Sequence, residues 1–375
     1  MRASFALGFT GFSLIAITYG MARFSWGLMM PAIVKEIPFS PYVSGMIAAC
    51  SYAAYCLSAV SASFSVIRFG PRVPAVISAL CASAGLLLLA CSSSSLMLAV
   101  GLFIAGLSSG LASPSLAGAV ASIIPEKQQT LANTVINAGT SAGIILAVLV
   151  LLMAPGGWRV ACVIFSVVAL ICLVPVIRYI PGRGANSSPE KSSWREILLS
   201  RSMRRLAIIS FISGTASAAW WSFGPEILQH HSGVDSSTTS MLWMISGGAG
   251  IIAVLTGAVT AFIGMRQLYR LSQLFMAAPL VLFAFSHGFS WWLFPAVALC
   301  GAGYVILSGV LLVCATSSAK KSPTSGVGVA FFMLAAGQVT GSVVFGQLYA
   351  AAGAAIALTV FASLSLMMMF LVPAE

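Results

Sequence analysis

The chain has 375 residues, of which 59% are hydrophobic and only 7% charged, and its mean hydropathy is +1.04. A soluble globular domain carries about 25% charged residues, so the composition excludes an ordinary soluble fold and indicates that lipid covers most of the surface. The net charge of +11 does not indicate nucleic-acid binding, because the cations lie in short loops between apolar runs and not on one face or arm.

The first apolar run begins near Phe5 and continues to about Val34. A signal peptide has an apolar core of only about 7–15 residues and ends at a small-residue cleavage site. We therefore interpret this run as a first spanning helix that also serves as an uncleaved anchor. Tyr19, Arg23 and Trp26 share one face of that helix, because their spacing is i, i+4, i+7.

Each crossing of a bilayer about 30 Å thick needs roughly 20 apolar residues in a helix. Apolar runs between charged, Gly/Pro-rich or Ser-rich breaks predict twelve such helices. In chain order they are Phe5–Ile33, Tyr42–Val66, Val73–Cys91, Leu96–Ile124, Leu131–Met153, Trp158–Ile177, Leu206–Leu228, Thr238–Ile263, Leu271–Ser286, Trp291–Cys314, Gly326–Tyr349 and Ala354–Val372. The sequence thus predicts an all-α membrane protein with 12 transmembrane helices.

The positions of the cations predict the orientation. Of the 18 lysine and arginine residues, all but three lie in segments that are cytoplasmic if the N-terminus is cytoplasmic. The exceptions are Lys35 and Arg159, in outer loops, and Arg23, within a helix. Because inner loops are enriched in Lys and Arg, we expect a multi-pass protein of a bacterial inner membrane with both termini in the cytoplasm.

One long polar stretch, from Pro181 to Arg205, divides the chain almost in half. Its first part has the composition of a linker. From Trp194 onward cations alternate with apolar residues, which predicts an amphipathic segment lying along the cytoplasmic face. We therefore expect a six-helix bundle over residues 1–180, a cytoplasmic linker over 181–205 and a second six-helix bundle over 206–375.

The two halves share short sequences at nearly constant spacing. Residues Ala22–Gly27 match Ala219–Gly224, and residues Ala138–Gly143 match Ala336–Gly341, with an offset near 197. Two pseudo-symmetric six-helix halves in parallel orientation are typical of a transporter built around an axis along the membrane normal. The second match also places glycines one helical turn apart in each half, which predicts that neighbouring helices approach closely there.

Over essentially its whole length the chain resembles the major facilitator superfamily. The signs are the layout of six plus six helices, the basic loop Arg68-Phe69-Gly70-Pro71-Arg72 and the sequence Gly157-Trp158-Arg159 that opens the sixth helix. The stretch Tyr19–Phe24, followed by Gly27 and Pro31, looks like a poorly characterised bacterial subgroup. The resemblance implies alternating access by a rocker-switch motion, a central cavity lined mainly by helices 1, 4, 7 and 10, and a gating role for Arg68, Gly70 and Arg72.

The chain departs from the superfamily pattern at several positions. Ile67 stands where an acidic residue usually precedes the basic loop, and Ala261 occupies the matching place before the ninth helix. Leu102 stands where a proton-linked arginine is expected, and the fifth helix lacks a Gly-Pro pair. These differences point away from a standard multidrug antiporter.

Arg23 is the main candidate for a substrate contact. It would lie roughly 7 Å outward of the bilayer midplane at 1.5 Å per residue, where a charge costs a few kcal/mol and must face protein or water. The sequence places no Asp or Glu near that depth, and a guanidinium group can hold a carboxylate or phosphate with two hydrogen bonds. We hypothesise that Arg23 receives an anionic group; alternatively, backbone carbonyls bind it and it holds the first helix against a neighbour.

The other candidates for substrate binding are aromatic or neutral polar residues. They are Asn137, Trp220, Trp221, Tyr304 and Gln338. The tryptophans would suit an apolar or planar substrate body, or they would simply pack in the core. The polar residues would bind substrate or join helices, a role worth about 0.6–2 kcal/mol each. Glu226 is a candidate for proton coupling, or else an exposed carboxylate beside His230 and His231.

The leading hypothesis is therefore transport of a small organic anion or an amphipathic metabolite with an anionic end. The alternative within transport is export of uncharged or cationic compounds, including drugs. A transporter-like sensor or scaffold would carry a soluble domain, whereas the longest polar segment here has about 25 residues. Without a Ser/His/Asp set, metal-ligand spacing or a phosphate-binding glycine loop, we expect no enzyme activity, metal or cofactor. We expect a monomer in the lipid bilayer that binds its small-molecule substrate and no nucleic acid. Whether a proton is transported together with the substrate stays open at this point.

Overall fold

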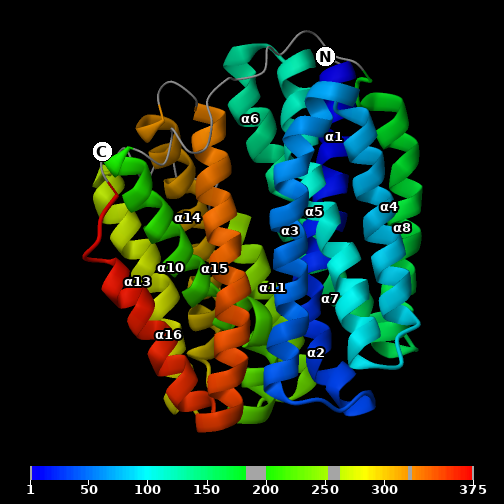
Figure 1. Ribbon diagram of the computed structural model, residues 1–375. Helices are drawn as coiled ribbons and strands as arrows, with labels where there is room; N and C mark the ends of the chain where they lie inside the picture. Colours follow the sequence, from blue (N-terminus) through cyan, green and yellow to red (C-terminus); the bar gives the residue numbers. More distant parts are fainter. Residues whose placement is uncertain (1, 183–199, 252–261, 320–322, 374–375) are drawn as a thin grey trace. The chain divides into compact units, whose positions relative to one another are not determined.

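The computed structural model describes residues 2–182, 200–251, 262–319 and 323–373, which form helices joined by short connections (Figure 1). Within these ranges ten helices are long and apolar enough to cross a membrane, and the shorter apolar helix α16 (Ala354–Met368) follows them. The predicted all-helical membrane fold is confirmed. Most of the predicted linker, part of the predicted eighth helix and five predicted inner cations lie outside the described residues. These cations are Arg183, Lys191, Arg195, Lys320 and Lys321.

Contacts divide the chain into two compact units. Unit 1 comprises Met1–Phe39 and Cys50–Pro189, and unit 2 comprises Ser40–Ala49 and Glu190–Glu375. The domain boundaries expected from the sequence, at residues 180 and 206, stay a prediction. The sequence did not predict that Ser40–Ala49, at the beginning of the second spanning helix, belong to unit 2.

Unit 1 begins with one continuous helix made of three segments. They are the α-helix α1 (Arg2–Ile15), the π-helix η1 (Ala16–Phe24) and the α-helix α2 (Ser25–Glu36). The helices that follow are α3 (Pro41–Phe69), of which unit 1 contains the part from Cys50 onward, α4 (Arg72–Ala90), α5 (Ser95–Ile123), α6 (Glu126–Asn137), α7 (Gly139–Met153) and α8 (Gly157–Tyr179). Helices α6 and α7 together make the fifth candidate span, and they meet at Ala138, which follows α6 and precedes α7.

Unit 2 begins with α10 (Arg201–Glu226), which continues into the short π-helix η2 (Ile227–His231). The remaining helices are α11 (Ser236–Ala249), α13 (Met265–Phe285), α14 (Leu293–Ser318), α15 (Pro323–Ala352) and α16. Asp235 caps α11, because its carboxylate accepts a hydrogen bond of 2.9 Å from the backbone N–H of Thr238. Hydrogen bonds from the Ser237 hydroxyl and from Thr238 hold the pKa of this carboxyl well below its usual range.

The same helix pairs pack together in both units. The first span packs against α7 in unit 1 as α10 packs against α15 in unit 2. Helix α4 packs against α5 and α8, and α13 correspondingly packs against α14 and α16. These matching pairs agree with the internal repeat that the sequence predicts.

Glycines allow the closest of these approaches. A β-carbon added to Gly139 would clash with the carbonyl oxygen of Phe12, and one added to Gly143 would clash with that of Ala16. Two glycines of α15 meet the backbone of α10 in the same way. They are Gly337 and Gly341. The close packing predicted from the glycine spacing is therefore present in each unit.

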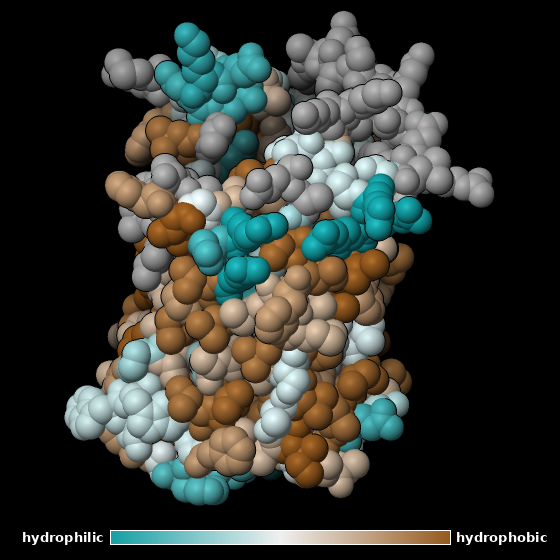
Figure 2. Space-filling model, turned by 90° about the vertical axis from the view of Figure 1, so that its left-hand side faces the viewer, coloured by the Kyte–Doolittle hydropathy of each residue, from teal (hydrophilic) through white to brown (hydrophobic). Residues whose placement is uncertain are grey.

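Apolar side chains cover the outer face of the helices. Figure 2 shows a broad hydrophobic band with hydrophilic atoms gathered above and below it on the face that includes α13 and α16. The exposed apolar side chains of these two helices include Leu274, Leu282, Phe285, Ile356 and Met367. Such a belt is what a helix bundle needs in order to face lipid hydrocarbon.

Candidate functional site

Arg23 lies inside unit 1 and is only 7% exposed. Its guanidinium carbon is 4.5 Å from the ring centroid of Tyr55 and 4.9 Å from that of Tyr52, both on α3. The rings of Tyr19 and Phe24, on η1 itself, lie at 5.7 Å and 5.5 Å. We call these four residues the aromatic cage. Ring faces attract a cation by about 2 kcal/mol or more when water is excluded, so the cage stabilises a buried positive charge.

The predicted helix face also contains Tyr19, which belongs to this cage, and Trp26, which follows it in the sequence. The Tyr19 hydroxyl is 2.7 Å from the hydroxyl oxygen of Ser113 on α5, and its ring meets that of Tyr55 edge-on at 6.3 Å. Tyr19 therefore joins η1 to both α3 and α5. Trp26 is 3% exposed, and no described residue accepts a hydrogen bond from its indole Nε1. A buried donor of this kind gains free energy when an acceptor reaches it.

Asn137 does not join the aromatic cage through any contact within the described ranges. It is the last residue of α6, its side chain is exposed, and its Nδ2 donates a hydrogen bond of 2.9 Å to the backbone oxygen of Asn133. This bond lies within α6 and uses one donor of the amide. The geometry therefore favours a structural role for Asn137 at the junction of α6 and α7.

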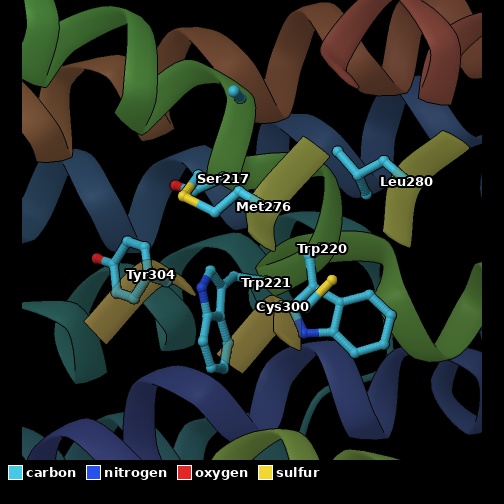
Figure 3. Close-up of a pocket in the computed structure, with 8 residues that line it drawn as sticks. Ser217, Trp220, Trp221, Met276, Leu280, Cys300 and Tyr304 are labelled. Carbon is cyan, nitrogen blue, oxygen red and sulfur yellow. The ribbon is translucent and has the colours of Figure 1, made fainter. Parts of the chain in front are cut away.

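Unit 2 contains a small cavity near the middle of α10 (Figure 3). Its lining residues are Ala216, Ser217, Trp220, Trp221, Met276, Leu280, Cys300 and Tyr304. Its volume of about 10 Å³ has room for roughly one water molecule. A substrate with a ring system fits only after side chains of the lining have moved.

The two tryptophans of this cavity contact different neighbours. The indole of Trp220 donates a hydrogen bond of 2.9 Å from Nε1 to the Ser246 hydroxyl and stacks on Phe283 at 5.2 Å. The ring of Trp221 meets Tyr304 at 5.4 Å and Trp243 at 5.5 Å, in both cases edge-on. Figure 3 shows Trp221 between Tyr304 on one side and Trp220 on the other. The structural contacts make Trp220 a core residue as well as a lining residue.

A neutral polar group adjoins two residues of the cavity lining, Tyr304 and Ser217. Gln338 is 1% exposed, and its Nε2 lies 3.2 Å from the Tyr304 hydroxyl and 3.4 Å from the Ser217 hydroxyl. These contacts join α10, α14 and α15. The cavity wall thus combines an aromatic surface with uncharged donors and acceptors, as ligand sites commonly do.

Glu226 ends α10 at the start of η2. Its carboxylate is 13% exposed and lies 3.7 Å from Nε2 of His230, one turn further along. His231 contacts the Ala284 carbonyl oxygen at 3.2 Å, and its ring centroid is 6.0 Å from that of His287. All three histidines of the chain therefore gather at this end of unit 2. In the part of the chain that the structure describes, no three His, Cys, Asp or Glu residues form a metal-binding group.

The basic loop predicted to act in gating connects α3 and α4. Gly70 has a φ of 78°, a left-handed conformation that favours glycine. Arg72 donates a hydrogen bond of 2.7 Å from Nε to the backbone oxygen of Ile180, just beyond the end of α8. Arg68 is exposed, with its guanidinium over the Phe69 ring. Arg72 thus satisfies a helix C-terminus inside unit 1.

Several residues at these sites were not found from the sequence. Tyr52 and Tyr55 lie three apart on one helix face, yet tyrosines in an apolar helix indicate packing as readily as binding. Trp243 and Ser217 gave no signal at all, because their place near the cavity depends on the packing of α10 against α11 and α14. Spacing along one helix predicts a shared face, whereas the partners across helices depend on the tertiary fold.

Comparisons with known proteins agree with this fold. A sequence model described as Major Facilitator Superfamily matches residues 12–342. A crystal structure of the nucleoside transporter NupG superposes with a TM-score of 0.79 and 14% identity, covering 99% of this chain and 98% of that one. A mutant of the same transporter gives a TM-score of 0.82 and 12% identity, covering 97% and 98%. No curated protein sequence matches the chain.

Proposed function

The chain belongs to the Major Facilitator Superfamily and is a transporter, and from this premise we propose that it carries a small organic anion or an amphipathic metabolite with an anionic end. The observation that supports this most is the burial of Arg23 in the first membrane span. A charged side chain at this depth is costly, and in transporters such residues mark the path of the substrate. We propose that Arg23 binds the anionic group of the substrate.

The aromatic cage supports this role for Arg23. Rings over a guanidinium group restrict how it can turn, and its N–H groups then point outward in the plane of the fork. Carboxylate and phosphate oxygens match that geometry with two parallel hydrogen bonds. A lysine at the same position would place a point charge without the fork, so the two side chains are not equivalent here.

Replacement of Arg23 tests the proposal in proteoliposomes. The Arg23→Gln variant should lose roughly 10- to 100-fold in uptake of the responsive anion, because a hydrogen bond to a charged group contributes about 1.5–3 kcal/mol. Arg178→Gln is the matched control, since Arg178 is an exposed arginine 5.8 Å from the Tyr179 ring. Wild-type uptake by Arg23→Gln, with the control equally active, would show that Arg23 does not bind the substrate.

A second candidate is transport of an uncharged planar compound, with a cationic compound as its variant. The cavity in unit 2 supports it, because Ser217, Tyr304 and Gln338 offer only uncharged groups beside aromatic rings. A thermal-shift screen separates the candidates, since a ligand that binds the folded state raises its melting temperature. The screen would compare carboxylates, organic phosphates, organic cations and nucleosides. If nucleosides or cations raise the melting temperature and no anion does, the second candidate replaces the anion proposal.

We propose that transport proceeds by alternating access, as the superfamily resemblance implies. Glu226 is the candidate for coupling to a proton, because this largely buried carboxylate adjoins His230. We propose a bacterial inner membrane as the location and a monomer as the transporting form. Light scattering of the detergent-solubilised protein would reveal a dimer if the monomer assignment is wrong.

A further inference from the structure

The two repeats are out of register along their first helices, and the change of register can be followed residue by residue. Gly139 and Gly337 lie 198 positions apart, as do Gly143 and Gly341. Gly139 meets the backbone of Phe12, whereas Gly337 meets that of Phe211, which is 199 positions after Phe12. These glycines therefore give a common frame in which α1 and α10 can be compared.

The difference in residue number between matching positions of the two first helices, which we call the offset, decreases along the chain. Gly143 contacts Ala16 and Gly341 contacts Thr215, again 199 positions apart. One turn later, a β-carbon on Gly20 would clash with Gly143, while Gly341 meets the Cβ of Ala218. Gly20 and Ala218 are 198 positions apart.

The offset falls once more after this turn. Ser25-Trp26-Gly27 and Ser222-Phe223-Gly224 are the matching sequences, and they lie 197 positions apart. The first helix of unit 1 thus contains two more residues between Ala16 and Ser25 than α10 contains between the matching residues Thr215 and Ser222.

The extra residues coincide with a change in helix type. The π-helix η1 covers Ala16–Phe24, whereas α10 is a regular α-helix throughout Arg201–Glu226. A π-helix closes its hydrogen bonds between residues i and i+5 and so holds more residues per turn than the 3.6 of an α-helix. Inserted residues can therefore be accommodated in π turns without breaking the helix or the packing on either side.

We infer that this two-residue insertion is the positioning element that places Arg23 in the aromatic cage. The segment η1 contains both Tyr19 and Arg23, and their partners Tyr52 and Tyr55 lie on α3. In unit 2 the matching α-helical turns instead direct Trp220 and Trp221 towards α11, α13 and α14. The inference rests on the proposed role of Arg23 in anion transport, because it explains how that side chain reaches its place.

A cross-linking experiment tests the position of residue 23 without measuring transport. In a variant without native cysteines, Arg23→Cys and Tyr55→Cys would be joined by a short thiol-specific cross-linker. Deleting Ala22, a residue 1% exposed inside η1, should reduce the cross-linked fraction at least fivefold. Ala22→Gly is the matched control, because it removes the same methyl group and keeps the register. An unchanged cross-linked fraction after the deletion overturns the inference.

Stability provides the second measurement. Because π turns already hold surplus residues, deletion of Ala22 should leave the melting temperature within a few degrees of wild type. Deletion of Ala219, which is buried in the matching stretch of α10, should abolish the folded protein, since an α-helix there has no residue to spare. Equal loss of folded protein in both deletion variants also contradicts the inference.

Transport then separates the two proposals. With Arg23 intact, deletion of Ala22 should lower anion uptake at least tenfold, while Ala22→Gly retains it. If Arg23→Gln transports normally, the proposed function fails, and the cross-linking still decides whether η1 positions residue 23. If Arg23→Gln is inactive and the Ala22 deletion transports normally, the positioning inference fails alone.

Discussion

At the scale of single residues, Arg23 illustrates how a charge can be held at membrane depth. Tyr52 and Tyr55 cover the guanidinium with ring faces at 4.9 Å and 4.5 Å. Tyr19 completes the link by its contact with Ser113 at 2.7 Å. The attraction of the rings offsets part of the cost of removing the charge from water.

Glu226 provides the residue-scale test of proton coupling. If this carboxylate exchanges the coupled proton, Glu226→Gln should remove the stimulation of uptake by an imposed pH gradient, because an amide cannot be ionised. Counterflow driven by substrate alone should continue, since it needs no net proton movement. The measurement is uptake with and without the gradient in proteoliposomes. Undiminished stimulation in the variant would exclude Glu226 as the coupling group, and His230→Gln shows whether its neighbour contributes.

At the scale of helices, the packing of the first span against α7 depends on small residues. Gly20 and Gly143 lie opposite each other, and Gly143 also meets the carbonyl oxygen of Ala16. Any β-carbon there forces the backbones apart. The same construction recurs between α10 and α15, so close approach of these helices is a property of each repeat.

Alanine substitutions test this packing. Gly143→Ala should destabilise the protein by about 1–3 kcal/mol, the usual cost of overpacking a tight core. Gly8→Ala is the matched control, because nothing lies within 4 Å of a β-carbon at that position of α1, and alanine favours a helix by about 0.5–1 kcal/mol over glycine. Thermal unfolding in detergent should therefore show a lower melting temperature for Gly143→Ala than for wild type, and no decrease for Gly8→Ala. Equal melting temperatures would mean that the helices can separate without cost.

At the scale of the whole molecule, two compact units repeat the same helix pairs, and their outer faces are apolar. The family match over residues 12–342 places the chain in the Major Facilitator Superfamily. Cations alone predict which ends face the cytoplasm, because lysine and arginine are retained on that side during insertion.

Cysteine labelling tests this orientation. Ser93, between α4 and α5, and Lys127, at the start of α6, are both exposed and lie on opposite sides in the predicted topology. In a cysteine-free background, Ser93→Cys should react with a membrane-impermeant maleimide in spheroplasts. Lys127→Cys should react only after the membrane is permeabilised. The reverse pattern of labelling would show that the termini face outward.

The sequence by itself determined the class of fold, because the length and number of apolar runs depend only on the thickness of a bilayer. It also located Arg23 and the paired glycines, since a buried charge and a glycine spacing stand out in a single helix. It predicted one face for Tyr19, Arg23 and Trp26 on the assumption of a regular α-helix. The structure instead has a π-helix over Ala16–Phe24, which contains Tyr19 and Arg23 and has more residues per turn than the α-helix assumed.

Only the tertiary structure decided what surrounds these residues. The cage of Tyr52 and Tyr55 comes from α3, and Trp243 comes from α11, so neither is visible in the spacing of the first or seventh predicted helix. Asn137 was singled out for its polarity, but its own helix satisfies it. Contacts between distant segments depend on how helices pack, and packing depends on shape complementarity over many residues, which no local pattern records.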